Sequence, residues 1–196
     1  MKTVSGFSAL LLACSLSAQA QQTCAWCGMQ DAPDSLSSSV QIALEAEPGD
    51  RLFVEGTVYQ QDGETPAEEV LIYVYHTNAR GVYPKRGDET DNAARHGYLR
   101  GWMKTDSEGR YRFETIRPAP YETHGGEPAH VHYTIQAPGQ DEYWLNAAWF
   151  SDDPRVTREN LAGLERTGGF SNVMEVSRDS VGVWHGRRDI ILESYD

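Results

Sequence analysis

The hydrophobic and polar positions of this chain alternate mostly with the period of a β-strand. Side chains of successive strand residues point to opposite faces, so such alternation predicts one buried and one exposed face. In residues 110–116, for example, Tyr111 and Phe113 alternate with polar residues. Residues 70–77, VLIYVYHT, are apolar at both parities, which indicates a central strand covered on both sides. Loops with proline or glycine separate the candidate strands, which are residues 52–59, 70–77, 110–116, 130–137, 145–150 and 181–192.

Only one segment has the pattern of a helix. It follows Pro154, carries Leu161 and Leu164 on one side, and stops at Gly168. Many short strands with turns between them and a single short helix are typical of an all-β protein. The sequence therefore predicts a β-sandwich of mixed or antiparallel strands with one short helix and long loops.

The start of the chain resembles a secretory signal. A basic residue precedes the apolar run at residues 7–12, and the tripeptide Ala-Gln-Ala that ends at Ala20 is a small-x-small cleavage site. We expect cleavage after Ala20 and a secreted or periplasmic protein, with a buried N-terminal helix as the alternative. Cys14 offers a lipoprotein anchor as a second route, although Leu12 suits that motif poorly. No later segment offers the about 20 apolar residues of a membrane-spanning helix.

The rest of the chain divides near residue 50. After the signal, residues 1–20, we expect an extended arm at 21–50, rich in Ser, Asp and Pro, and one globular domain at 51–196. The arm carries Cys24 and Cys27 in CAWCGMQDAP. Such a pair can be a redox couple, half a zinc site or a small disulfide. No helix pattern follows it and no other cysteine would survive cleavage, so a local disulfide is our interpretation.

The charge of the chain excludes some partners. Its formal net charge is −12 with histidine neutral, and loss of the signal, which contains Lys2 and no acidic residue, makes it −13. Nucleic acid and anionic membrane surfaces are therefore poor partners.

Two histidines stand two residues apart in EPAHVHYTI. Strand geometry places His130 and His132 on one face, about 6.5 to 7 Å apart at the backbone. Val131 and Tyr133, at the opposite parity, would face the core. A pair on one face directly after Pro-Ala favours a metal site over solvated histidines, but two histidines do not identify the ion.

Tyr121 is the notable residue upstream of this pair. It lies between Pro118, Pro120 and a Gly-Gly loop, nine residues before His130. Proline fixes the backbone there, so the ring is aimed rather than free. The alternative is a ring packed under a loop with its hydroxyl bonded to the backbone.

The stretch TDSEGRYRFETIRPAPYETHGGEPAHVHYTI resembles the core motif of the intradiol ring-cleavage dioxygenases, the family of protocatechuate 3,4-dioxygenase and catechol 1,2-dioxygenase. In that family the proline-flanked tyrosine and both histidines of Pro-Ala-His-x-His bind a non-haem ferric ion. These positions match Tyr121, His130 and His132. The fourth ligand of the family is a tyrosine in a Gly-x-Tyr step after a central strand, which matches Tyr83. The resemblance covers roughly residues 52–154.

The resemblance implies an enzyme that holds Fe(III) and acts on a catechol and O2. Two phenolates are hard anionic donors that favour Fe(III), and the two imidazoles add no charge. Tyr121 would leave the metal and take a substrate proton, while Tyr83 would stay bound. Insertion of O2 between the two hydroxylated carbons would give a muconate-type product. No organic cofactor or external reductant is required.

Two positions depart from the family pattern. Glu127 stands where the resemblance places an arginine that stabilises charge on the substrate, and Ala147 stands where it places a glutamine of the pocket. Loss of a cation disfavours anionic substrates such as protocatechuate, unless Arg100, Arg117 or Lys85 reaches the site. Glu127 and Arg117 are therefore the expected neighbours of the ligands and the substrate.

Two other interpretations stay open. The same sandwich can bind iron and chelate catechols or catecholate siderophores without cleaving them, which the two departures favour. A transthyretin-like sandwich with zinc or no metal, and with the tyrosines in its core, is the other. The chain has no room for the long N-terminal helical dimer region of the catechol 1,2-dioxygenases, so we expect a monomer or a simple homo-oligomer.

Overall fold

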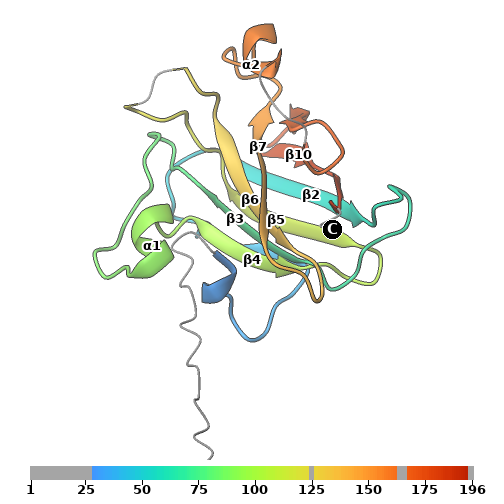
Figure 1. The fold of residues 1–196 in the computed structure, drawn as a ribbon. Helices are drawn as coiled ribbons and strands as arrows, with labels where there is room; N and C mark the ends of the chain where they lie inside the picture. The colour runs from blue at the N-terminus through green and yellow to red at the C-terminus, as the bar shows by residue number, and fades with distance from the viewer. Residues whose placement is uncertain (1–27, 124–125, 163–166, 194–196) are drawn as a thin grey trace, which may run out of the picture.

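The computed structural model describes residues 28–123, 126–162 and 167–193. The expected signal, Cys14, Cys24 and Cys27 lie outside the described residues. Two β-sheets pack against each other, with short helices at their edges (Figure 1). None of the helices in the described ranges is long and apolar enough to cross a membrane.

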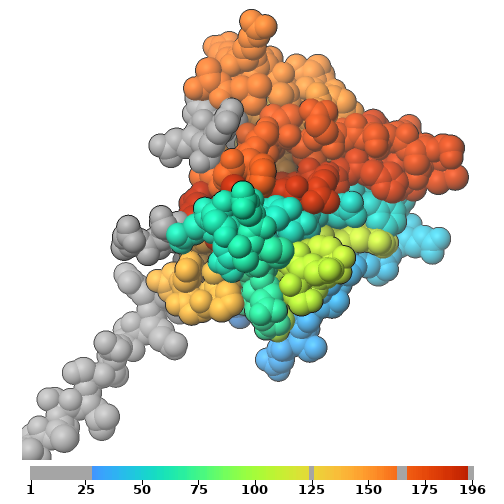
Figure 2. All heavy atoms as spheres, turned by 90° about the vertical axis from the view of Figure 1, so that its right-hand side faces the viewer, coloured from blue at the N-terminus to red at the C-terminus, as the bar shows by residue number. Residues whose placement is uncertain are grey.

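The first sheet is mixed. It is built around β2, which pairs antiparallel with β5 and parallel with β10 and β11. Its path is β1 (Ser39–Gln41), β5 (Arg110–Ile116), β2 (Arg51–Tyr59), β10 (Trp184–Arg187) and β9 (Val176–Arg178), with β11 (Ile190–Ile191) beside β2. Figure 2 shows the C-terminal segment, in orange to red, lying against the region of β2 in cyan.

The second sheet carries both histidines of the Pro-Ala-His-x-His motif. Its neighbours pair antiparallel except the last two, which are parallel. The order is β4 (Arg100–Lys104), β3 (Leu71–His76), β6 (His130–Gln136), β7 (Tyr143–Phe150) and β8 (Val173–Met174). The all-β sandwich expected from the alternating pattern is confirmed.

The core lies between the two sheets and follows the alternation of the strands. On β6, Val131, Tyr133 and Ile135 are at most 1% exposed, as their parity predicted. On β5, Tyr111 and Phe113 are buried in the same cluster. Each such apolar side chain contributes about 1.5 to 3 kcal/mol by leaving water. The opposite faces of these strands point away from the core and can carry functional side chains.

The expectation of a single helix is incomplete. The structure has α2 (Arg158–Ala162) in the expected segment, whose expected continuation at 163–166 lies outside the described residues, and also α1 (Asp91–His96). Six residues are too few to display a helical period. α1 ends at Gly97, which has φ +68°, and a Cβ there would lie 2.5 Å from the carbonyl oxygen of Pro84. This turn therefore requires glycine.

The C-terminal strand pattern is interrupted. A single strand over 181–192 is wrong: the chain first turns around Asp179, whose Oδ1 accepts the amides of Val181 and Val183. It is interrupted again where the carboxylate of Asp189 accepts the amide of Thr57, in place of a backbone carbonyl. Side-chain acceptors that compete with the backbone end strands in this way.

The described part of the expected arm packs on the domain. β1 pairs in parallel with β5, with Ser39 opposite Arg112. A 3-10 turn, η1 (Gly28–Asp31), lies on β3 and β4, where Trp102 Nε1 donates to the carbonyl of Gly28 over 2.8 Å. This turn covers part of the outer face of the second sheet.

Candidate metal centre

The two histidines lie on the outer face of the second sheet, at the start of β6. Because Val131 and Tyr133 face the core, alternation turns His130 and His132 to the other side. The pairing of β6 with β7 shifts register between Val131 and Tyr133, so β7 holds an extra residue there, in the step that contains Ala147. Bulges of this kind commonly re-aim side chains beside functional sites.

The two tyrosines come from loops that are tied to each other. Gly81 has φ +76°, and a Cβ on it would meet the carbonyl oxygen of Pro120 at 1.9 Å, so only glycine permits this approach. The amide of Ala119 donates to the carbonyl of Asn78 over 3.0 Å, and Thr77 Oγ1 donates to the carbonyl of Ala119 over 2.7 Å. These contacts bring the Tyr83 loop and the Tyr121 loop to one place.

The polar ends of the four side chains converge. The hydroxyls of Tyr83 and Tyr121 are 2.7 Å apart, and each lies 3.0 Å from Nε2 of His132. Nε2 of His130 lies 3.0 Å from the Tyr121 hydroxyl and 3.0 Å from Nε2 of His132. Four donor atoms from β6 and two separate loops therefore meet in one cluster.

This cluster fits a metal ion. Donors about 3 Å from one another surround an ion that each of them contacts at about 2 Å. Nδ1 of His130 lies 2.7 Å from the carbonyl oxygen of Pro128, which can only accept, so Nδ1 carries the hydrogen and Nε2 presents a lone pair to the cluster. Burial, then the neighbouring His130, lowers the pKa of His132 to about 3, so the His132 imidazole is neutral at neutral pH.

The phenols are an essential part of the donor set. Across residues 28–123, 126–162 and 167–193, no three or more His, Cys, Asp or Glu side chains group as a metal site. Burial raises the pKa of Tyr83 and of Tyr121, and the charge of Glu127 raises both further. Without a cation the two side chains are neutral phenols at neutral pH, so a cation is needed to hold them as phenolates.

Comparison with known proteins identifies the family of the chain. The sequence model of a family described as dioxygenase matches residues 29–168. The chain belongs to this dioxygenase family. The resemblance seen in the motif is thereby confirmed, whereas the four side chains as iron ligands stay a prediction.

Relatives of this chain are dioxygenases by name. The protocatechuate 3,4-dioxygenase beta chain of Burkholderia cepacia is 29% identical over 136 residues, 67% of this chain and 54% of the relative. Catechol 1,2-dioxygenase 2 of Acinetobacter lwoffii is 32% identical over 108 residues, 47% of this chain and 38% of the relative. The dioxygenase chain thus spans about half, or less, of the length of these relatives.

A solved structure supports the fold. The dioxygenase domain of a dioxygenase and carbohydrate-binding protein fusion from Streptomyces sp. SirexAA-E is 25% identical, with a TM-score of 0.61. The match covers 83% of this dioxygenase chain and 92% of that domain. The sandwich therefore has the architecture of a known dioxygenase domain.

Sequence reasoning missed one ring beside the four donor side chains. Tyr75 pairs directly with His132 between β3 and β6, and the two rings stack with centroids 4.4 Å apart at 13°. On its other side Tyr75 stacks on His96 of α1, at 3.7 Å and 10°. The sequence did contain a signal for this ring. Tyr73 and Tyr75 are two residues apart in VLIYVYHT, so both rings lie on the same face of the strand.

Glu127 and Arg117 have different surroundings. Glu127 is exposed, and its charge raises the pKa of both phenols. Arg117 lies instead against Asp152, to which its Nη1 donates over 2.9 Å, and its guanidinium covers the ring of Trp184 at 4.2 Å. The structure thus gives Arg117 partners other than the four donor side chains.

Arg100 and Lys85, the other two basic candidates for a charge near the substrate, also lie in other surroundings. Arg100 forms an ion pair with Asp31 at 2.7 Å and lies over the Trp102 ring at 4.9 Å. Lys85 is exposed to solvent. A positive charge in place of the family arginine is therefore not supplied by the contacts of Arg100 or Arg117.

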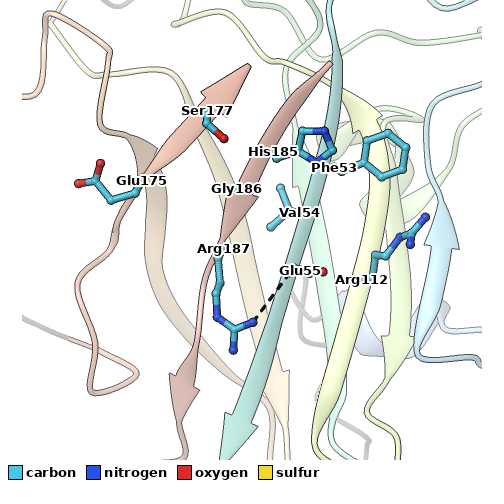
Figure 3. A pocket seen from close by; sticks show the side chains of 9 residues that line it. All are labelled: Phe53, Val54, Glu55, Arg112, Glu175, Ser177, His185, Gly186 and Arg187. Atoms are coloured by element: carbon cyan, nitrogen blue, oxygen red, sulfur yellow. Dashed lines mark ion pairs between the residues drawn. The ribbon is translucent and has the colours of Figure 1, made fainter. Parts of the chain in front are cut away.

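A cleft of about 500 Å³ adjoins the donors on the outer face of the second sheet. Its lining includes Tyr75, His132, Thr134 and Trp144, of which Trp144 is 59% exposed. Its volume is within the range of small-molecule sites. A second hollow, of about 400 Å³, lies on the first sheet around Phe53 and His185 and includes none of the four donors (Figure 3).

Proposed function

We propose that this chain binds Fe(III) through Tyr83, Tyr121, His130 and His132 and is an intradiol dioxygenase. The reaction inserts O2 between the two hydroxylated carbons of a catechol and gives a muconate-type product. The observation that carries the proposal is the convergence of two phenol oxygens and two imidazole nitrogens, each within 3.0 Å of at least two of the others. The catechol and protocatechuate dioxygenases among its relatives support the same reaction class.

The bound ferric ion supplies a Lewis acid and a template that holds the catechol for attack by O2. The chain contributes the rest. Nδ1 of His130 donates its hydrogen to the carbonyl of Pro128, which leaves the lone pair of Nε2 to bind the metal. Away from the metal, burial holds the pKa of Tyr121 above its ordinary value, so its oxygen would take up the proton of a catechol hydroxyl.

The surroundings of the site favour neutral catechols. Glu127 adds a negative charge near the phenols, and the two arginines that were candidates for a counter-charge are paired with Asp31 and Asp152. The cleft is lined by the aromatic side chains of Tyr75 and Trp144, and the exposed ring of Trp144 suits an aromatic substrate. We therefore assign catechols without a carboxylate, rather than protocatechuate, as the substrate class.

One preparation tests the proposal. Protein made in iron-supplied cells should contain about one iron per chain, absorb visible light through phenolate-to-iron charge transfer, and consume O2 with catechol. Tyr83→Phe should lose the absorption, whereas Tyr98→Phe, a change at a tyrosine bound to Glu47 instead, should not. Colourless, iron-free wild-type protein would contradict the proposal.

A second function has its own observation in favour. Glu127 and Ala147 replace the residues that the family uses on the substrate, which suits a protein that binds iron and a catechol without cleaving it. Such a binder would shift the visible absorption when catechol is added and would consume no O2. Oxygen uptake over a panel of catechols separates the two functions.

We also propose that the protein is exported. The apolar run at 7–12 and the site after Ala20 support cleavage there. Protein isolated from the periplasm or the medium should begin at Gln21, and protein found only in the cytoplasm with its full N-terminus would contradict export.

A further inference from the structure

Three rings form a continuous stack beside the donor cluster. Tyr75 lies in the middle, with His96 on one side at 3.7 Å and His132 on the other at 4.4 Å. The three planes are nearly parallel, at 10° and 13°. One of the outer rings is a candidate ligand, and the other belongs to α1, which has no donor in the cluster.

The outer end of the stack is fixed independently of the metal. His96 is only 5% exposed, and its Nδ1 shares a hydrogen bond of 2.8 Å with the hydroxyl of Tyr73, the neighbour of Tyr75 on the same face of β3. The short helix that carries it is closed by Gly97 against Pro84. His96 therefore cannot move away without breaking this bond and opening the turn.

The two histidine donors are aimed by different means. His130 is oriented by the hydrogen bond from its Nδ1 to the Pro128 carbonyl. His132 has a flat neighbour across one face of its ring, so rotation of the imidazole about its own bond to the chain drives its edge into Tyr75. Such a rotation would carry Nε2 away from the two phenol oxygens that lie 3.0 Å from it.

We propose that Tyr75, backed by His96, is a positioning residue that holds the plane of His132 so that Nε2 faces the metal. The inference rests on the proposed iron site, because it concerns one of the ligands of that site. Tyr75 acts here through its ring and not through its hydroxyl. The aromatic ring, and not the phenol, is therefore what the metal site needs at this position.

The test measures iron retention, not turnover. Wild type, Tyr75→Leu, Tyr75→Phe and His96→Leu are loaded with Fe(III), and the visible absorption per iron and the half-time of iron loss to excess chelator are recorded. Loss of the ring should speed iron loss about tenfold or more, the range seen when an outer partner of a metal ligand is removed. Tyr75→Phe should retain iron as the wild type does, and His96→Leu should lie between.

The first sheet provides a matched control. Phe53 stacks on His185 with centroids 5.5 Å apart at 11°, in the hollow of Figure 3, so Phe53→Leu removes the same kind of contact from a histidine without metal partners. This variant should keep the wild-type absorption and iron retention. Melting temperatures of all variants without iron show how much stability each change costs.

The outcomes separate the two proposals. If the wild type takes up no iron, the proposed function and this inference both fail. If the wild type is coloured and Tyr75→Leu keeps iron equally long, only the inference fails. Should Tyr75→Leu not fold, a folded His96→Leu with wild-type retention overturns the inference, as would a Tyr75→Phe that loses iron rapidly.

Discussion

The outer faces of the two sheets carry the same local feature in opposite surroundings. On the second sheet Tyr75 stacks on His132, and on the first sheet Phe53 stacks on His185. His132 lies among other polar donors, and burial lowers its pKa to about 3. His185 is half exposed and lies 3.0 Å from Asp179.

What covers each face accounts for the difference. α1, η1 and the two tyrosine loops lie over the second sheet, so its polar groups are desolvated and gather around one point. The first sheet is left to water, and its charges pair with close neighbours, as Arg112 does with Glu114 and Arg187 with Asp189. A ring stacked on a histidine thus belongs to the proposed metal site only where the chain removes the solvent.

The largest expected effect is the loss of a donor. His132→Ala should abolish iron binding, because it removes one of four donors and leaves the two phenols without their shared partner. The loss should exceed the about 10- to 100-fold that removal of an outer partner costs. Iron content by elemental analysis measures it, and His185→Ala should leave the content unchanged. An equal iron content in His132→Ala and His185→Ala would show that the outer faces of the two sheets do not differ in metal binding.

The second effect is on stability as the pH falls. His76, at the end of β3, is fully buried between Thr77 and Thr115, and burial lowers its pKa to about 4. Between about pH 6.5 and pH 4 the unfolded chain binds a proton there and the folded chain does not, so stability falls as the pH falls through this window. Each unit of pKa is about 1.4 kcal/mol, so the loss is about 3 kcal/mol.

Denaturant unfolding of the iron-free protein at several pH values measures this loss. His76→Gln should show a shallower decline in the free energy of unfolding than the wild type, by about one proton. His185→Gln, on the exposed face, should follow the wild-type curve. Parallel curves for all three proteins would show that burial of His76 is not the cause.

A smaller effect concerns the charge at the site. Glu127→Arg restores the positive charge that the family pattern places before Pro-Ala-His-x-His. A charge-assisted hydrogen bond contributes about 1.5 to 3 kcal/mol, so KM for protocatechuate should fall about tenfold or more. Glu127→Gln should lower it less. Steady-state O2 uptake measures both, and a variant that still rejects protocatechuate would place the specificity elsewhere.

The smallest effect is expected on the first sheet. Arg112→Gln breaks an exposed ion pair with Glu114, and such pairs contribute about 1 kcal/mol or less. The melting temperature should barely change, and iron content should not change at all. A clear loss of iron would mean that the two faces are coupled through the core.

Strand parity predicted that His130 and His132 share one face, because that signal is local. Tyr83 and Tyr121 were placed beside them by the resemblance to the dioxygenase motif. The ring of Tyr75 was not predictable in its role, because its contacts depend on the register of β3 against β6. The helix that brings His96 has only six residues, too few for a period.

The fold was predictable to a similar extent. The strand at 110–116 agrees with β5 at both ends, because a turn residue precedes alternating side chains. The break after Arg187 was not foreseen, because it arises when the Asp189 carboxylate takes the amide of Thr57, a residue distant in the sequence. Contacts between distant segments, rather than local preferences, decided the parts that sequence reasoning missed.

The row of rings on the second sheet continues past Tyr75. Tyr73 stacks on Tyr75 at 5.5 Å and on Trp102 at 5.0 Å, and Trp102 donates to the carbonyl of Gly28. A Cβ at Gly28 would lie 2.1 Å from the ring of Tyr73, so this position accepts no side chain. For protein engineering this means that Gly28 should stay unchanged in any variant, since a side chain there would press on the rings that lead to the proposed metal centre.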